Sequence, residues 1–93
     1  MKVKLKGNEY EIKNGLKAML VFEALTEKPF AINDLTDLCK YEYCMVYANN
    51  DGFSMDFNDF LDELENEDVQ KAFSEAMNMK QPLDTKKKTK AKG

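Results

Sequence analysis

The spacing of apolar and polar residues predicts a β-hairpin at the start of the chain. Residues 2–12 alternate with a period of two, which places apolar side chains on one face and charges on the other. Gly7-Asn8 suits a two-residue turn, and the lysines before it can face the glutamates after it. A lone hairpin is only marginally stable, so we expect its apolar face to rest on the helix that follows.

The most apolar stretch comes next. Residues 15–30 contain a run of ten in which only Lys17 and Glu23 are polar. The run is too short to span a bilayer, which takes about 20 apolar residues. It is also too apolar on all sides for a surface helix with a single apolar stripe. We therefore expect a central helix that Asn14 caps, that stops before Pro29, and that its own domain, a second copy or a partner covers on most sides.

Three further helices follow. The second, over about residues 35–49, has a suitable N-cap in Asn33 or Asp34, is apolar on more than one side, and is expected to pack along the first. A third over about 56–65 and a fourth over about 69–79 each show one apolar stripe. The stripes are Phe57, Phe60, Leu61 and Leu64 in the third helix, and Val69, Ala72, Phe73, Ala76 and Met77 in the fourth. The predicted fold is α+β: an N-terminal hairpin packed on a bundle of about four helices.

Charge divides the chain into an acidic body and a basic tail. Residues 1–79 carry eight lysines against sixteen acids, a net charge of −8, whereas residues 80–93 carry six lysines against one aspartate, a net charge of +5. We expect a single domain over 1–80 and a disordered, lysine-rich tail over 81–93, which has no apolar period. No aromatic residue interleaves with these lysines, which favours a solvated tail over a nucleic-acid contact.

The absence of three residue types argues against common kinds of catalysis. The chain has no histidine, arginine or tryptophan. Histidine is the commonest general base and metal ligand near neutral pH, and arginine is the preferred partner of phosphate. We therefore expect a binding protein with no catalytic site, cofactor or bound metal. The eight acids within residues 51–68 fit neither register of an EF-hand loop and are interpreted as solvated helix faces.

The chain carries no sign of export. No apolar run follows a basic start, so we expect no signal peptide and no membrane partner. Cys39 and Cys44 lie five residues apart in a predicted helix and point in different directions. We expect two buried free thiols in a reducing cytoplasm.

Several short motifs stand out in this order of elements. They are Phe22-Glu23 followed by Leu25-Thr26, then Tyr47-Ala48-Asn49, then a Phe-x-x-Phe-Leu-Asp helix from Phe57 to Asp62. Over residues 8–77 the chain resembles the tail assembly chaperones of long-tailed bacteriophages. Many relatives have a glycine after the threonine, where this chain has Glu27.

The resemblance implies a non-catalytic protein of the host cytoplasm that is absent from the mature virion. Such chaperones keep the tape-measure protein soluble and help to recruit tail-tube protein. Two alternatives remain open: a structural tail or connector component, and a small acidic regulator that binds a host protein. All-round apolar helices also lead us to expect self-association. The residues expected to contact partners are Leu16, Leu20, Phe22, Glu23, Tyr43 and Tyr47.

Overall fold

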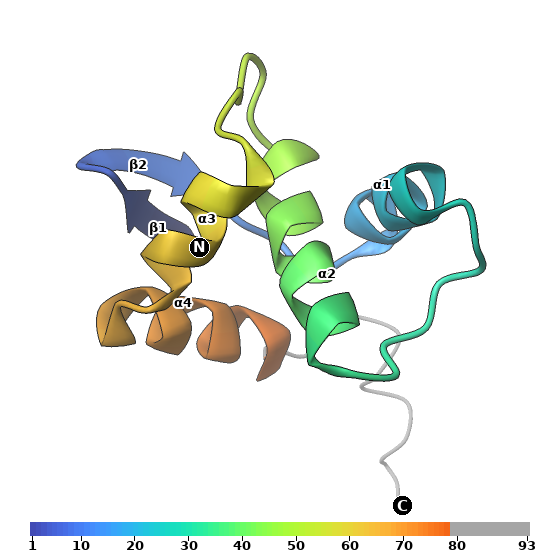
Figure 1. Cartoon of the computed structure of the whole chain (residues 1–93). Coiled ribbons are helices and arrows are strands. Elements are labelled where there is room, and N and C mark those ends of the chain that lie inside the picture. The colour runs from blue at the N-terminus through green and yellow to red at the C-terminus, as the bar shows by residue number, and fades with distance from the viewer. Residues whose placement is uncertain (79–93) are drawn as a thin grey trace, which may run out of the picture.

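The structure is a computed structural model that describes residues 1–78, and it contains the predicted hairpin and helices (Figure 1). The fold is α+β, as predicted. The lysine-rich tail expected over 81–93 and the last predicted residue of the fourth helix lie outside the described residues. The elements are β1 (Lys2–Leu5), β2 (Asn8–Glu11), α1 (Leu16–Thr26), α2 (Leu35–Tyr47), α3 (Phe57–Leu64) and α4 (Glu67–Asn78).

The hairpin turns one residue earlier than predicted. β1 and β2 pair antiparallel, and Leu5 lies opposite Asn8, so the turn consists of Lys6 and Gly7. Both turn residues have positive φ, 50° and 83°, which matches the twist of two strands joined by two residues. Asn8 therefore belongs to β2. The lysines of β1 face the glutamates of β2, as predicted.

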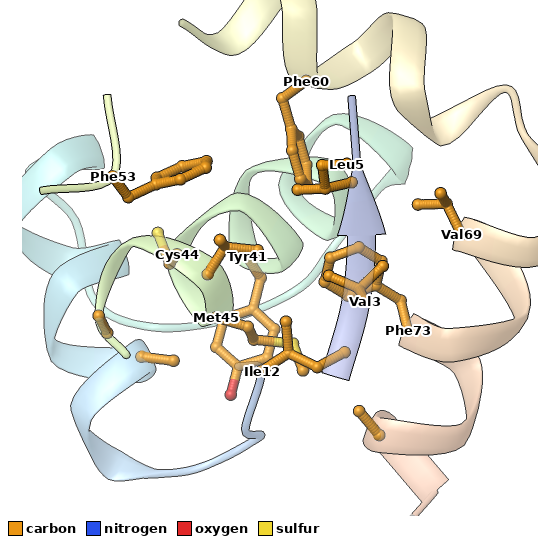
Figure 2. Close-up of a cluster of buried hydrophobic side chains, with 14 of the residues drawn as sticks. Val3, Leu5, Ile12, Tyr41, Cys44, Met45, Phe53, Phe60, Val69 and Phe73 are labelled. Atoms are coloured by element: carbon orange, nitrogen blue, oxygen red, sulfur yellow. The ribbon is translucent and has the colours of Figure 1, made fainter. Parts of the chain in front are cut away.

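The apolar face of the hairpin packs against α4, and the predicted contact with the first helix is wrong. In Figure 1, α2 lies between α1 and the half of the molecule that contains the hairpin, α3 and α4. Figure 2 shows Val3 and Leu5 beside Phe60 and Phe73. The aromatic stripes of α3 and α4 need a second apolar surface to bury them, and the hairpin supplies it.

The helix at the centre of the fold is α2, in place of the predicted α1. Its residues Tyr41, Cys44, Met45 and Val46 are fully buried. α1 packs along it, as predicted, while α3 contacts another side of it. The rings of Phe22 and Phe30 lie 6.2 and 5.0 Å from the ring of Tyr41 and join α1 and the following loop to α2.

Aspartates cap α2 and α3. The Asp34 carboxylate accepts a hydrogen bond from the backbone N–H of Asp37 at 2.8 Å, as the sequence indicates. Asp56 accepts one from the N–H of Asp59 at 2.9 Å at the start of α3. Each bond satisfies an N–H that lacks a partner within the helix.

The start of α1 differs from the prediction, whereas its end lies before Pro29, as predicted. Its N-cap is Gly15, without a side-chain bond, and Asn14 accepts a hydrogen bond from the Tyr41 hydroxyl instead of capping the helix. The helix ends at Thr26, three residues before Pro29. Glu27 ends it in the left-handed region, with a φ of 58°, and its N–H donates to the carbonyl of Glu23.

One side-chain amide ties the end of α2 to the end of the hairpin. The Asn50 Oδ1 atom accepts from the N–H of Glu11 at 2.9 Å, and its Nδ2 atom donates to the carbonyl of Glu11 at 2.7 Å. The same Nδ2 atom donates to the carbonyl of Val46, in the last turn of α2, at 2.8 Å. Asn50 therefore bonds both backbone groups of Glu11, as a further strand beside β2 would, in addition to the pairing of Glu11 with Lys2 of β1.

We expect Asn50→Asp to lower the free energy of unfolding by about 2–3 kcal/mol, because a carboxylate oxygen would then face two carbonyl oxygens. Urea unfolding followed by circular dichroism measures the change. The matched control is Asn58→Asp, at an exposed position of α3, which should change the free energy by about 0.5 kcal/mol or less. Equal effects at the two positions would contradict the role given to Asn50.

Glu27→Gly should raise the free energy of unfolding by about 0.5–1 kcal/mol, because glycine adopts the left-handed region without the clash that a Cβ atom causes. Glu27→Ala is the control, since it removes the same side chain but keeps the Cβ atom. Thermal unfolding of the three proteins measures the difference. A gain of equal size with alanine would show that the side chain, and not the backbone, is responsible.

Candidate functional site

The outer face of α1 exposes a row of apolar side chains. Ala18 and Phe22 turn toward the core and are buried. Leu16 and Leu20 lie one turn apart on the other side of the helix and are 71% and 56% exposed. Ala24, a further turn along, is also exposed. We call Leu16, Leu20 and Ala24 the α1 face; within residues 1–78 no element covers it.

Further apolar side chains are exposed beyond this face. Leu25 lies on another side of α1, next to a hollow of about 270 Å³ that Tyr43 and Phe57 also line. Ile32 and Leu35, in the loop after α1 and at the start of α2, are exposed as well. Exposed apolar residues therefore follow α1 and the loop to the start of α2.

The structure separates the predicted contact residues into surface and interior. Leu16 and Leu20 are on the surface, and Tyr47 is half exposed at the end of α2. Phe22 is fully buried, so its ring contributes to the core and not to the surface. Tyr43 lies among four other aromatic rings, from Tyr47, Phe53, Phe57 and Phe60.

Two polar groups of this set, those of Tyr43 and Glu23, bond within the chain. The Tyr43 hydroxyl donates to the carbonyl of Met55 at 2.6 Å. Glu23 is exposed, and its carboxylate accepts from the N–H of Phe30 at 2.7 Å. This bond holds the turn after α1, so Glu23 has a structural contact in the folded chain.

A second surface feature is a groove of about 700 Å³ between α2, α3 and α4. We call it the α2–α4 groove. Its walls are mainly apolar, and none of the residues that line it comes from α1. The apolar lining residues include Leu35, Leu38, Leu61, Leu64 and Met77. Sequence reasoning missed the groove, because it placed the partner contacts on the first helix and at Tyr43 and Tyr47, and none of these residues lines it.

Glu42 lies in this groove without a counter-charge. Its side chain is partly buried and makes no hydrogen bond or ion pair with another residue in the described range 1–78. Burial raises the pKa of Glu42 to about 7, because the groove solvates its carboxylate poorly. The signal in the sequence was a single charge within the apolar run from Tyr41 to Ala48.

The pKa of Asp37, one and a half turns earlier on α2, is shifted in the opposite direction. Its carboxylate accepts from the N–H of Asn33 and from the Nζ atom of Lys28, each at 3.1 Å. The hydrogen bond from Asn33, followed by that from Lys28, lowers the pKa of Asp37. Residues 1–78 therefore supply partners for the buried Asp37 and none for the partly buried Glu42.

The two cysteines are free thiols, as predicted. Cys44 is fully buried, and burial raises its pKa to about 11. Cys39 is partly buried in the groove, where burial and the neighbouring Glu42 raise its pKa. Both thiols are therefore protonated and weakly nucleophilic at neutral pH. Across residues 1–78, no group of three potential ligands could hold a metal ion. The same residues contain no helix long and apolar enough to cross a membrane.

The free energy of unfolding should fall as the pH rises from 5 to 8. The folded state holds a proton on Glu42 up to about pH 7, whereas an unfolded glutamate releases it near 4.5, so deprotonation costs the folded state about 1–3 kcal/mol. Glu42→Gln should remove this slope and stabilise the chain at pH 8. Urea unfolding at both pH values measures it, and Glu65→Gln, at the exposed rim, should leave the slope unchanged. An unchanged slope in Glu42→Gln would contradict the assignment.

Comparison with known proteins adds no relative. No family model, no curated protein and no solved structure matches this chain. The surfaces described above therefore carry the functional argument.

Proposed function

We propose that this protein is a phage tail assembly chaperone that binds the tape-measure and tail-tube proteins through the α1 face. The observation that carries the proposal is the exposure of Leu16 and Leu20, each by more than half, on a helix whose opposite side is in the core. The sequence resemblance to phage chaperones supplies the identity of the clients.

The physical properties of the α1 face suit temporary binding of an apolar client. Burial of apolar surface contributes roughly 25 cal/mol per Å², so two leucines and an alanine supply modest affinity. Modest affinity allows release once the client has assembled. The acidic body, with a net charge of −8 over residues 1–79, keeps a chain with exposed leucines soluble.

A second copy of the chain competes with the client for the same leucines. An exposed apolar stripe on a small domain favours self-association, and the monomer then exposes the α1 face only after dissociation. Such a protein acts in the host cytoplasm during assembly and is absent from the finished virion.

Coexpression with a client tests the proposal. The tape-measure protein encoded in the same genome is expressed alone, with the wild-type chain, and with Leu16→Ser/Leu20→Ser. We expect the wild-type chain to raise the soluble fraction of the tape-measure protein several-fold and the double variant to lose most of that gain. Both substituted residues are exposed, so the variant should keep its fold, which circular dichroism checks.

The matched control is Lys13→Ser/Lys17→Ser, which changes two exposed polar residues at the same end of α1 and should keep the activity. Unchanged client solubility with the wild-type chain would contradict the proposal. Mass spectrometry of purified virions separates a chaperone from a structural tail component, because only the structural component remains in the particle.

A further inference from the structure

We infer that the α2–α4 groove receives one amphipathic helix of a partner protein and that a lysine or arginine in the apolar face of this helix pairs with the Glu42 carboxylate. This inference concerns a different surface from the α1 face and does not depend on the identity of the client. It rests on the shape of the groove, its lining and its charge.

The shape favours a helix. The groove runs between three helices, with one wall from α2 between Leu35 and Glu42 and the others from α3 and α4. Its volume of about 700 Å³ lies within the range of natural binding sites for compact ligands, 300–1,000 Å³. An open groove with leucine walls matches the way in which amphipathic helices insert spaced apolar side chains.

The lining explains why the occupant has to be apolar. Leu38, Leu61 and Leu64 come from two different helices and face the same space, and Leu35 is 73% exposed at its edge. Water in the groove cannot hydrogen-bond to these leucine side chains. A partner helix with leucine, isoleucine or methionine at positions three and four apart would displace it.

The charge of the groove explains why the occupant has to carry a cation. Within residues 1–78, the charged side chains that line it are Glu42 and Glu65, and both are acidic. Among the described residues, Glu42 has no ion-pair partner, in contrast to Asp37, which Lys28 neutralises. A buried carboxylate without a partner is costly, and a lysine or arginine that arrives with an apolar helix removes this cost.

Because of this pairing, the affinity for the partner helix and the stability of the fold should change with pH in opposite directions. Among residues 1–78, the polar groups that line the groove with Glu42 are Cys39 from α2, Glu65 at the end of α3, and the uncharged Gln70, Ser74 and Asn78 from α4. A cation prefers the ionised carboxylate, so affinity should fall as the pH decreases from 8 to 5, although the fold alone becomes more stable.

The probe for the test is a yeast-displayed library of 16-residue helical peptides, selected for binding to the full-length chain at pH 8. We expect the selected peptides to share a lysine or arginine flanked by large apolar residues at helical spacing. Their affinity, measured by fluorescence anisotropy, should fall about tenfold with Glu42→Gln and about tenfold between pH 8 and pH 5.

Two matched variants separate the groove from the rest of the surface. Glu65→Gln, at the exposed rim, should change the affinity less than twofold, and Leu16→Ser/Leu20→Ser, on the α1 face, should leave it unchanged. Glu42→Gln keeps the size of the side chain, and a thermal melt at pH 8 shows whether it remains folded. If it does not fold, Leu64→Ala provides a second test of the groove, with the same expected loss.

Three outcomes would overturn the inference. The first is a selection that recovers no peptide, and the second is a set of peptides without the cation or without sensitivity to Glu42→Gln. The third is displacement of the selected peptides by a synthetic peptide of residues 79–93 in a manner that depends on Glu42. That result would make the chain's own end, which follows directly from Asn78 at the groove, the occupant.

Discussion

The whole fold depends on the burial of α2 on two sides. Tyr41 and Cys44 are buried together with Met45 and Val46, and these four residues cover more than half of the circumference of the helix. α1 contacts one side, and α3 and the hairpin complete the other (Figures 1 and 2). Since a 93-residue chain can form only one sizeable core, the two halves of the molecule share this helix.

A shared helix also has to be fixed along its axis, and polar groups do this at its two ends. At the start, Asp34 caps α2, and Asp37 holds the loop from α1 through Lys28 and Asn33. At the end, the Asn50 side chain joins the last turn of α2 to Glu11 in the hairpin. Apolar packing alone tolerates sliding, whereas these hydrogen bonds specify one position.

The sequence predicted those elements in which periodicity and burial agree. The stripes of α3 and α4 and the alternation of β1 lead to Phe60, Phe73, Val3 and Leu5 in the core, and this was confirmed. The predicted cap of α2 was also confirmed. The element that covers the apolar face of the hairpin was not predictable. Periodicity shows which face of an element is apolar but not which other element covers that face. The choice between the adjacent α1 and the distant α4 depends on tertiary packing.

The candidate surfaces were harder to predict for the same physical reason. The hydropathy of an apolar side chain is the same whether it binds a partner or packs in the core. Leu16 and Phe22 therefore look equivalent in the sequence. The structure separates them by placing Phe22 against Tyr41 and leaving Leu16 outside. Tyr43 likewise has its ring and hydroxyl occupied inside the molecule.

The two acids of α2 differ in whether their negative charge stabilises the fold. The donors around Asp37 stabilise its ionised carboxylate and lower its pKa, so its charge serves folding. Burial raises the pKa of Glu42 to about 7, so its ionisation costs the fold free energy, and a glutamine or leucine at this position would suit the isolated chain better. A residue whose charge works against folding but lies in an apolar groove makes physical sense when another molecule completes its environment. Function in this chain is therefore to be sought where the described structure leaves apolar surface uncovered and a charge without a partner.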